Sequence, residues 1–182
     1  MPTTALLVID IQRGAFDGVR CPPIDRADTL VGNAASLVAA ARDAGLPIVF
    51  VQHCEGAGEP FEEGSPHGEF VEALSPQPGD TVIRKRASSA FENTALGATL
   101  AQWGVDEIAV CGLQSEHCVS NTSKSALALG LRVRVAQDGH GTWPWQGRSS
   151  QDIAAAANAD LAALGAQLEP SVELAATLRS LR

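Results

Sequence analysis

The stretch EIAVCGLQSEHCVSNTSKSALALG, residues 107–130, contains the pattern that repeats along the whole chain. Its first part, EIAVCG (107–112), is a short apolar run of the kind that forms a strand buried on both faces. Its last part, HCVSNTSKSALALG (117–130), has the length and composition of a helix and ends at Gly130, a good helix stop. The stretch therefore predicts a strand, a short loop and a helix in direct succession.

The same alternation continues over the rest of the 182 residues. Further strands are predicted at 5–11, 47–53, 81–85, 131–138 and 166–170, and further helices at 29–45, 94–104, 149–164 and 171–182. A capping-box-like pair, Asp25 and Asp28, precedes the first helix. Because apolar strands that alternate with helices form parallel sheets covered on both faces, we predict one α/β domain over residues 1–182.

The composition of the chain limits the kinds of molecule that the protein is expected to bind. The formal net charge of −8 argues against general binding to nucleic acid or to an anionic membrane, since both need a basic face. The N-terminus lacks the pattern of a signal peptide, and no apolar run is long enough to span a membrane. The cysteines have no metal-type spacing and are expected to be free thiols: Cys21, Cys54, Cys111 and Cys118. We therefore expect a cytoplasmic protein that acts on a small molecule.

Polar side chains stand where the predicted strands end. Asp10 follows ALLVI, His53 ends the second strand, Lys85 ends the third and Asp138 ends the fifth. The loop GLQSEHC (112–118) follows the fourth strand. Ligands bind at the carboxyl ends of the strands in such sheets, so an acid, a base and a thiol are expected to converge at one edge.

Cys118 is the candidate nucleophile. With Ser115 as N-cap it falls in the first helical turn, where unpaired amide N–H groups and the helix dipole favour a thiolate. Helix geometry alone suggests the backbone N–H groups of Cys118 and His117 as donors to an oxyanion. The alternative is a buried, unreactive cysteine, as expected for Cys111 inside its apolar strand.

Asp10 and Lys85 each allow a functional and a plain structural interpretation. A carboxylate at the end of an apolar strand needs a partner if it is buried, and it can act as general base towards a thiol. The plain alternative for Asp10 is a helix cap or turn residue. Lys85 lies in the run RKR (84–86), which a solvated basic edge would also explain. Next to Cys118 or Asp10, its ammonium would favour the anionic form of either group.

Three motifs in order resemble one known family. DIQRGAF (10–16), KRASSAFENTAL (85–96) and CGLQSEHCVSNTSKSALALG (111–130) are similar to the motifs of the isochorismatase-like cysteine hydrolases. The resemblance runs from ALLVID to QDGHGT, residues 5–142. The family also includes nicotinamidases, N-carbamoylsarcosine amidohydrolases and ureidoacrylate-type amidases.

The resemblance implies a three-layer α-β-α fold with a doubly wound, mainly parallel six-stranded sheet. It implies a catalytic triad of Asp10, Lys85 and Cys118, and a cis peptide bond at Leu113–Gln114. It also implies oxyanion donors at the backbone N–H groups of Gln114 and Cys118. Gln114 takes the place of His117, which helix geometry alone suggests beside Cys118. No cofactor and a homodimer or homotetramer are expected on the same ground.

Further residues are candidates for contact with the substrate: Phe16, His53, Phe91, His117 and Trp143. For Trp143, packing at a subunit interface is an equally good interpretation. His53 fits a hydrogen-bonded residue at the edge of the site. Relatives that bind a metal carry an Asp-x-His pair after the second strand, whereas this chain reads VQHCEG, so we predict no catalytic metal.

The expected chemistry is cleavage of a carbon–nitrogen amide or ureido bond through a thioester on Cys118. Asp10 would act as general base and then acid, and Lys85 as the electrostatic partner of both groups. One alternative is an isochorismatase-type hydrolysis of a vinyl ether, in which Asp10 protonates the substrate and no thiol is needed. Another is a non-hydrolytic, redox-responsive thiol protein of the same fold.

Overall fold

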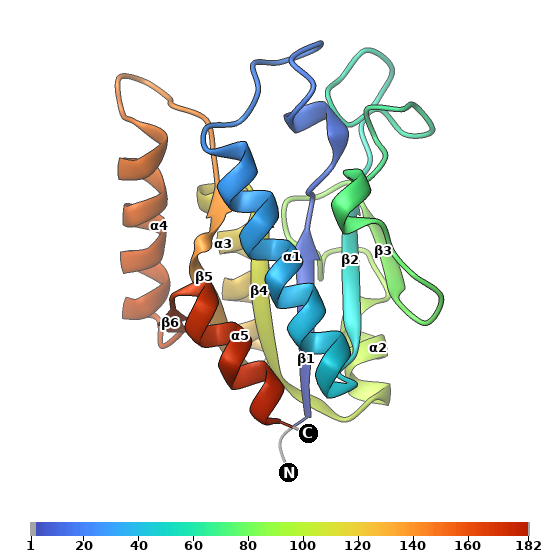
Figure 1. The fold of residues 1–182 in the computed structure, drawn as a ribbon, viewed down its shortest axis with the longest axis vertical. Helices are drawn as coiled ribbons and strands as arrows, with labels where there is room; N and C mark the ends of the chain where they lie inside the picture. Colours follow the sequence, from blue (N-terminus) through green and yellow to red (C-terminus); the bar gives the residue numbers. More distant parts are fainter. Residues whose placement is uncertain (1–2, 182) are drawn as a thin grey trace.

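A parallel β-sheet forms the centre of the computed structural model, which describes residues 3–181 (Figure 1). Its strands are β1 (Thr3–Ile9), β2 (Ile48–His53), β3 (Thr81–Lys85), β4 (Val105–Leu113), β5 (Arg132–Gly141) and β6 (Gln167–Glu169). They lie in the order β3-β2-β1-β4-β5-β6, and every pair of neighbours is parallel. The predicted six-stranded parallel sheet is confirmed for the described residues.

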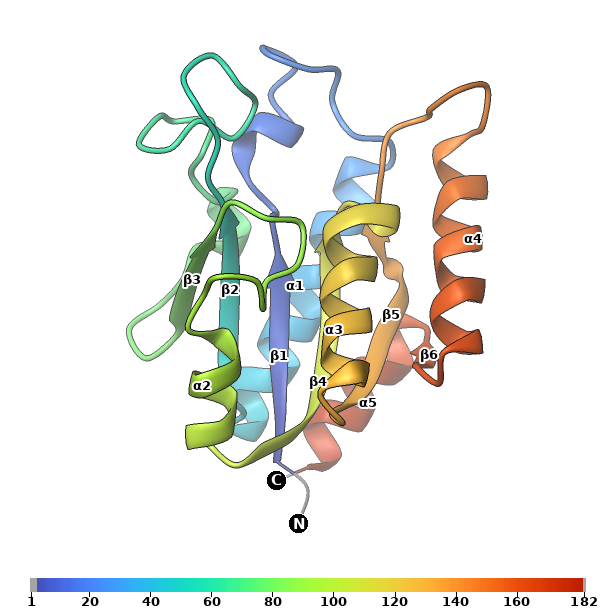
Figure 2. The same ribbon diagram turned by 180° about the vertical axis from the view of Figure 1, so that it is seen from behind.

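Helices cover both faces of this sheet, which gives the predicted three-layer architecture. One face carries α1 (Ala27–Ala44) and α5 (Ser171–Ser180), which pack against each other (Figure 1). The other face carries α2 (Leu96–Gln102), α3 (Ser120–Ala128) and α4 (Ser150–Ala163) (Figure 2). Among the described residues, no helix combines the length and the apolar character that crossing a membrane requires.

The apolar run of β1 explains why the sheet is buried on both sides. Alternate side chains of a strand point to opposite faces, so Leu7 and Ile9 join the core beneath α2 and α3. Leu6 and Val8 join the separate core beneath α1 and α5. All of these side chains are fully buried, which is why β1 is continuously apolar rather than alternating.

The connections create an opening at the carboxyl ends of the two central strands. From β1 the chain proceeds outward to β2 and β3, then returns to β4 on the other side of β1 and continues to β5 and β6. Ligand sites of doubly wound sheets lie where the strand order reverses in this way, here between β1 and β4. The loops at 10–26, 54–70 and 142–149 gather above that point (Figure 2).

Gly112 allows β4 to approach β1 closely just before both strands end. It has a φ of +131°, and a Cβ atom added there would lie 2.0 Å from the carbonyl oxygen of Ile9. A side chain at this position is therefore excluded by both backbone conformation and space. The close approach brings the residues after Ile9 beside the loop that follows β4.

Two local predictions are wrong, in both cases because a side chain has a tertiary partner. Helix α1 has Arg26 at its N-cap with no side-chain cap, because the Asp25 carboxylate instead accepts a hydrogen bond from Ser150 Oγ, 2.7 Å away. Asp138 lies inside β5 and accepts hydrogen bonds from the backbone N–H and hydroxyl of Ser171, where α5 begins. It therefore does not reach the proposed ligand edge.

The predicted cap of α4 is confirmed, since Ser149 accepts from the backbone N–H of Asp152.

His140 ties the end of β5 to two other elements. Its Nδ1 lies 2.8 Å from Ser115 Oγ, in the loop after β4, and its Nε2 lies 2.8 Å from Asn158 Oδ1 on α4. The ring is buried, and this burial lowers the pKa of His140 below its ordinary value. A neutral ring can donate to Asn158 and accept from Ser115, so both contacts are satisfied without a charge.

We expect Gly112→Ala to destabilise the protein by about 2 kcal/mol or more, because the strands must separate or the backbone must distort. Urea unfolding followed by circular dichroism measures this loss. Gly32→Ala is the matched control, since Gly32 lies inside α1 with open space around it and the change should stabilise the helix by about 0.5–1 kcal/mol. Equal effects of the two substitutions would contradict the close approach.

We expect His140 to make the protein less stable in mild acid. Below about pH 6.5 the unfolded chain binds a proton at this residue while the folded protein does not, so the free energy of unfolding falls as pH falls. His140→Gln removes this proton, and the variant should lose less stability than the wild type between about pH 7.5 and about pH 5.5. His117→Gln, at an exposed position, is the control for the replacement of a histidine elsewhere in the protein. Parallel slopes for wild type and His140→Gln would refute the assignment.

Candidate active site

Asp10 is the first residue after β1, and its conformation is fixed by the neighbouring strand. Its backbone N–H donates to the carbonyl of Val51 on β2 at 2.9 Å, and its φ is +54°, a region that aspartate tolerates better than most residues. The side chain is almost completely buried. The carboxylate thus sits at the reversal point of the sheet, as the sequence predicted.

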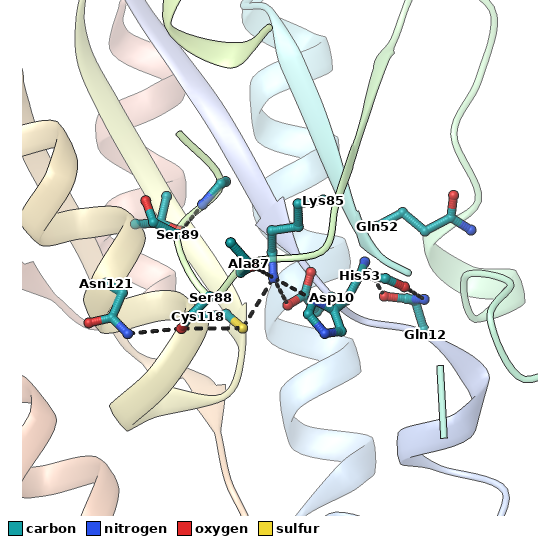
Figure 3. A network of polar contacts seen from close by, with 12 residues as sticks. Asp10, Gln12, Gln52, His53, Lys85, Ala87, Ser88, Ser89, Cys118 and Asn121 are labelled. Carbon is teal, nitrogen blue, oxygen red and sulfur yellow. Dashed lines mark hydrogen bonds and ion pairs between the residues drawn. The ribbon is translucent and has the colours of Figure 1, made fainter. Parts of the chain in front are cut away.

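Lys85 is the last residue of β3, and its ammonium group is the centre of the site (Figure 3). Nζ lies 2.8 Å from Asp10 Oδ2 and 3.2 Å from Cys118 Sγ. It also lies 3.0 Å from His53 Nδ1 and 3.1 Å from the carbonyl oxygen of Ala87. An ammonium has three hydrogens, so these four acceptors share them. The interpretation of Lys85 as a solvated edge residue is excluded, because only 2% of the residue is exposed.

Burial and charge shift the pKa values of Lys85 and Asp10 in opposite directions. Burial alone would lower the pKa of Lys85, but the nearby Asp10 carboxylate and Cys118 sulfur raise it above its ordinary value. Burial raises the pKa of Asp10, and the ammonium of Lys85 counteracts this. Each charge therefore depends on the other, because both groups are buried and little solvent screens them.

The surroundings of Cys118 favour the protonated thiol, contrary to the expectation of an acidic thiol. Burial raises the pKa of Cys118 to about 11, and the carboxylate of Asp10 acts in the same direction. Lys85 lowers it, but by less than these two effects raise it. A desolvated site beside a carboxylate thus outweighs the helix terminus on which the prediction rested.

The helix terminus itself also differs from the prediction. Residues Ser115–Val119 form a single π-helical turn, and α3 begins only at Ser120. Ser115 does not cap this turn, because its hydroxyl is bonded to His140. Turns of this kind are frequent at functional sites, since they change the direction of one side chain within a helix. Here the turn carries Cys118, whose sulfur faces Lys85.

His53, at the end of β2, contacts the other side of the ammonium. Burial first, and then the charge of Lys85, lower the pKa of His53 to about 4. The ring is therefore neutral, with Nδ1 accepting from Lys85 and Nε2 directed towards Glu55 Oε1, 3.6 Å away. The backbone N–H of His53 donates to Gln12 Oε1, and Gln12 Nε2 donates to the carbonyls of His53 and Gly68.

A cavity of about 490 Å³ opens above Cys118. Asp10, His53, Gln114 and Trp143 are among the residues that line it. Proline and aromatic side chains supply much of the wall, including Pro22, Pro23, Phe61 and Trp145. The size and the mainly apolar wall with a few polar groups fit a small molecule.

The candidate substrate contacts divide into two groups. His53 and Trp143 line the cavity with the proposed triad member Cys118. Phe16 and Phe91 do not; both are half-buried and pack against the hydrophobic cores. The side chain of His117 is 61% exposed and faces Glu116 rather than the cavity.

The peptide bond between Leu113 and Gln114 is cis, and both residues contribute to the cavity wall.

Asp10, His53 and Cys118 each offer a ligand atom within 4.8 Å of the others, a geometry that a metal ion can use. The ammonium of Lys85, however, already contacts an atom of each of the three. In this arrangement the lysine supplies the positive charge that a metal would otherwise bring.

Several residues that shape the site were missed by the sequence analysis. Gln12 is fully buried and bridges the end of β1 to β2 and to the loop at 54–70, and its position two residues after Asp10 was the only available signal. Ser88 lies 3.9 Å from the sulfur of Cys118 and accepts a hydrogen bond from Asn121. Glu55 lies in an aperiodic loop, where no pattern marks it.

Comparison with known proteins gives concordant results. The isochorismatase domain family matches residues 4–168. Streptothricin hydrolase of Streptomyces noursei is 37% identical over 139 residues, which cover 76% of this chain and 50% of that protein. Maleamate amidohydrolase of Pseudomonas putida is 30% identical over 152 residues, which cover 74% of this chain and 70% of that protein.

The solved structure of an isochorismatase from Pseudomonas putida KT2440 has a TM-score of 0.87 and 31% identity, and covers 95% of this chain and 92% of that one. The chain spans about half the length of the streptothricin hydrolases that it matches. The family match covers most of the chain, and the fold agrees with it over almost the full length. The chain therefore belongs to the isochorismatase family.

Proposed function

We propose that this protein is a cysteine hydrolase that cleaves a carbon–nitrogen amide or ureido bond of a small molecule. The observation that carries the proposal is the position of one buried ammonium, Lys85 Nζ, within 2.8 Å of a carboxylate and 3.2 Å of a thiol. These groups adjoin a cavity of suitable size. Relatives whose names describe amide hydrolysis support the choice of a carbon–nitrogen bond.

In the first half of the reaction, the Asp10 carboxylate accepts the proton of the Cys118 thiol as the sulfur attacks the carbonyl carbon. The negative charge that develops on sulfur is stabilised by the ammonium of Lys85. Protonated Asp10 then gives the same proton to the departing nitrogen, the carbon–nitrogen bond breaks, and a thioester remains on Cys118.

In the second half, Asp10 accepts a proton from a water molecule that attacks the thioester. The carbon–sulfur bond breaks, the proton returns to the sulfur, and a carboxylic acid or carbamate leaves. The backbone N–H groups of Gln114 and Cys118 are the proposed oxyanion donors, at the point where the chain enters the π-helical turn.

This cycle starts from a protonated thiol. Because burial and Asp10 raise the pKa of Cys118, we propose that the nucleophile forms together with attack on the substrate. A non-hydrolytic redox role is less well supported, since oxidation depends on thiolate in the resting state. A vinyl-ether hydrolase would leave the contact between Lys85 and Cys118 without a purpose.

We expect intact mass spectrometry to detect an acyl adduct on Cys118 when the wild type is incubated with a panel of amides and ureido acids. Cys118→Ala should form no adduct and lose at least about a thousandfold in kcat/KM, because the intermediate cannot form. Cys54→Ala is the control, since Cys54 is a buried thiol outside this cavity. Release of pyruvate from a vinyl ether by Cys118→Ala would instead establish the alternative chemistry.

We expect Asp10→Asn to separate thiol reactivity from catalysis. The carboxylate raises the pKa of Cys118, so its removal lowers that pKa and increases the thiolate fraction at about pH 8. Alkylation of Cys118 by iodoacetamide, followed by peptide mapping, should become faster in the variant, while hydrolysis falls by about 10²–10⁴-fold. In the wild type, alkylation should keep accelerating as pH rises towards 11. A wild-type midpoint near neutral pH would contradict the protonated thiol.

A further inference from the structure

We propose that the substrate carries a positive charge, such as an ammonium or amidinium group, which the carboxylates of Glu55 and Asp25 bind in the cavity above Cys118. This inference rests on the proposed function, because it assigns a substrate class to the same site. Three features carry it: the charges on the cavity wall, the way both carboxylates are held, and the aromatic side chains around them.

The cavity has an excess of negative charge. Its ionisable acidic side chains are Asp10, Asp25 and Glu55, and within the described part of the chain no lysine or arginine contributes to its wall. Asp10 is paired with the buried Lys85 at 2.8 Å, so these two charges cancel. The charges of Asp25 and Glu55 therefore remain for a ligand.

Glu55 is held in place without being neutralised. Its Oε2 accepts a hydrogen bond from the backbone N–H of Phe61 at 2.8 Å. Its Oε1 faces His53 Nε2 at 3.6 Å, and this ring is neutral because its pKa is about 4. The carboxylate thus has no cationic partner in these contacts, while its orientation is fixed.

Asp25, in the loop that precedes α1, supplies the second negative charge. Its Oδ2 accepts a hydrogen bond from Ser150 Oγ at 2.7 Å, which anchors it to the start of α4. Asp25 is exposed and lines the cavity, so its carboxylate is accessible to a ligand there. The bond to Ser150 thus holds the carboxylate away from the N-terminus of α1, which the sequence had suggested that it caps.

Two arginines of the surrounding loops, Arg20 and Arg148, are engaged in other contacts. Arg20 forms an ion pair with Glu62 and donates to the carbonyl of Glu59. Arg148 donates to the carbonyl of Asp152. An anionic substrate would therefore meet two carboxylates and no free cation on the wall, and this arrangement disfavours it by like-charge repulsion.

Aromatic side chains complete a site for an organic cation. Trp143 is held by a hydrogen bond from its Nε1 to the carbonyl of Pro22 at 2.6 Å, and Trp145 is 69% exposed beside it. Indole faces attract ammonium groups. Asp25 and Glu55 join no group of three ligand side chains close enough for a metal ion within residues 3–181, which favours an organic cation over a metal.

The test measures charge selection at Cys118 without requiring turnover. Aminoethyl, methyl and sulfonatoethyl methanethiosulfonate are cationic, neutral and anionic reagents that modify the same sulfur. Labelling rates at Cys118, resolved by peptide mapping and divided by the rates for a free thiol, should favour the cation over the anion by at least about tenfold. The ratio cancels differences in the intrinsic reactivity of the sulfur. A ratio near one, or one in favour of the anion, overturns the proposal.

Variants that remove one carboxylate show which residues make Cys118 prefer the cationic reagent. Glu55→Gln and Asp25→Asn should each reduce the ratio several-fold, and the double variant should abolish it. Glu59→Gln is the matched control, because Glu59 lies in the same loop and outside the cavity wall. An unchanged ratio in the double variant would overturn the assignment to these two carboxylates.

Failure of this inference is distinguishable from failure of the proposed function. An acyl adduct on Cys118 with no charge selection would leave the hydrolase intact and remove the cationic substrate. Charge selection with no adduct from any amide in the panel, cationic amides included, would leave the binding site and remove the hydrolase. Added salt should weaken the selection, since the charges act partly through solvent.

Discussion

The buried ion pair between Lys85 and Asp10 is the interaction on which the rest of the site depends. Two desolvated charges are tolerated only when they face each other, and removal of one partner from such a pair typically costs about 3–5 kcal/mol. The pair is the meeting point of successive strands: Lys85 ends β3, His53 ends β2, Asp10 follows β1, and Cys118 lies in the turn after β4. The long lysine stem is needed because β3 and β1 are not neighbours, and the ammonium must reach past β2. The order of the strands thus dictates the order of the chemical groups.

The strands and the three central side chains could be predicted because their signals are local. Apolar runs that end in a polar residue mark the carboxyl edge of a parallel sheet, and this placed Asp10, Lys85 and Cys118 together correctly. The pairing of His53 with the ammonium could not be predicted, since it depends on the parallel register that sets His53 opposite Lys85. The π-helical turn was missed because no local pattern marks it, and the partner of Ser115 there, His140, is distant in the sequence.

The ionisation of Cys118 shows why a position in the sequence does not determine a pKa. A cysteine near a helix start is favoured as a thiolate only if water or positive charge dominates its surroundings. Here the sulfur is half-buried and shares its ammonium with a carboxylate, a histidine and a carbonyl group, so the balance favours the thiol. The contacts that would make Asp10 a suitable base in the proposed reaction also favour the protonated form of Cys118.

The charges on the cavity wall connect this resting state to the choice of substrate. The carboxylates of Glu55 and Asp25 add negative charge to a site in which a thiolate is already disfavoured. A cationic group bound between them would neutralise that charge, and by doing so it would lower the free energy of forming the thiolate at the moment when the carbonyl arrives. Substrate recognition and activation of the nucleophile would then be the same electrostatic event. A neutral or anionic amide of the same shape would not lower this free energy in the same way.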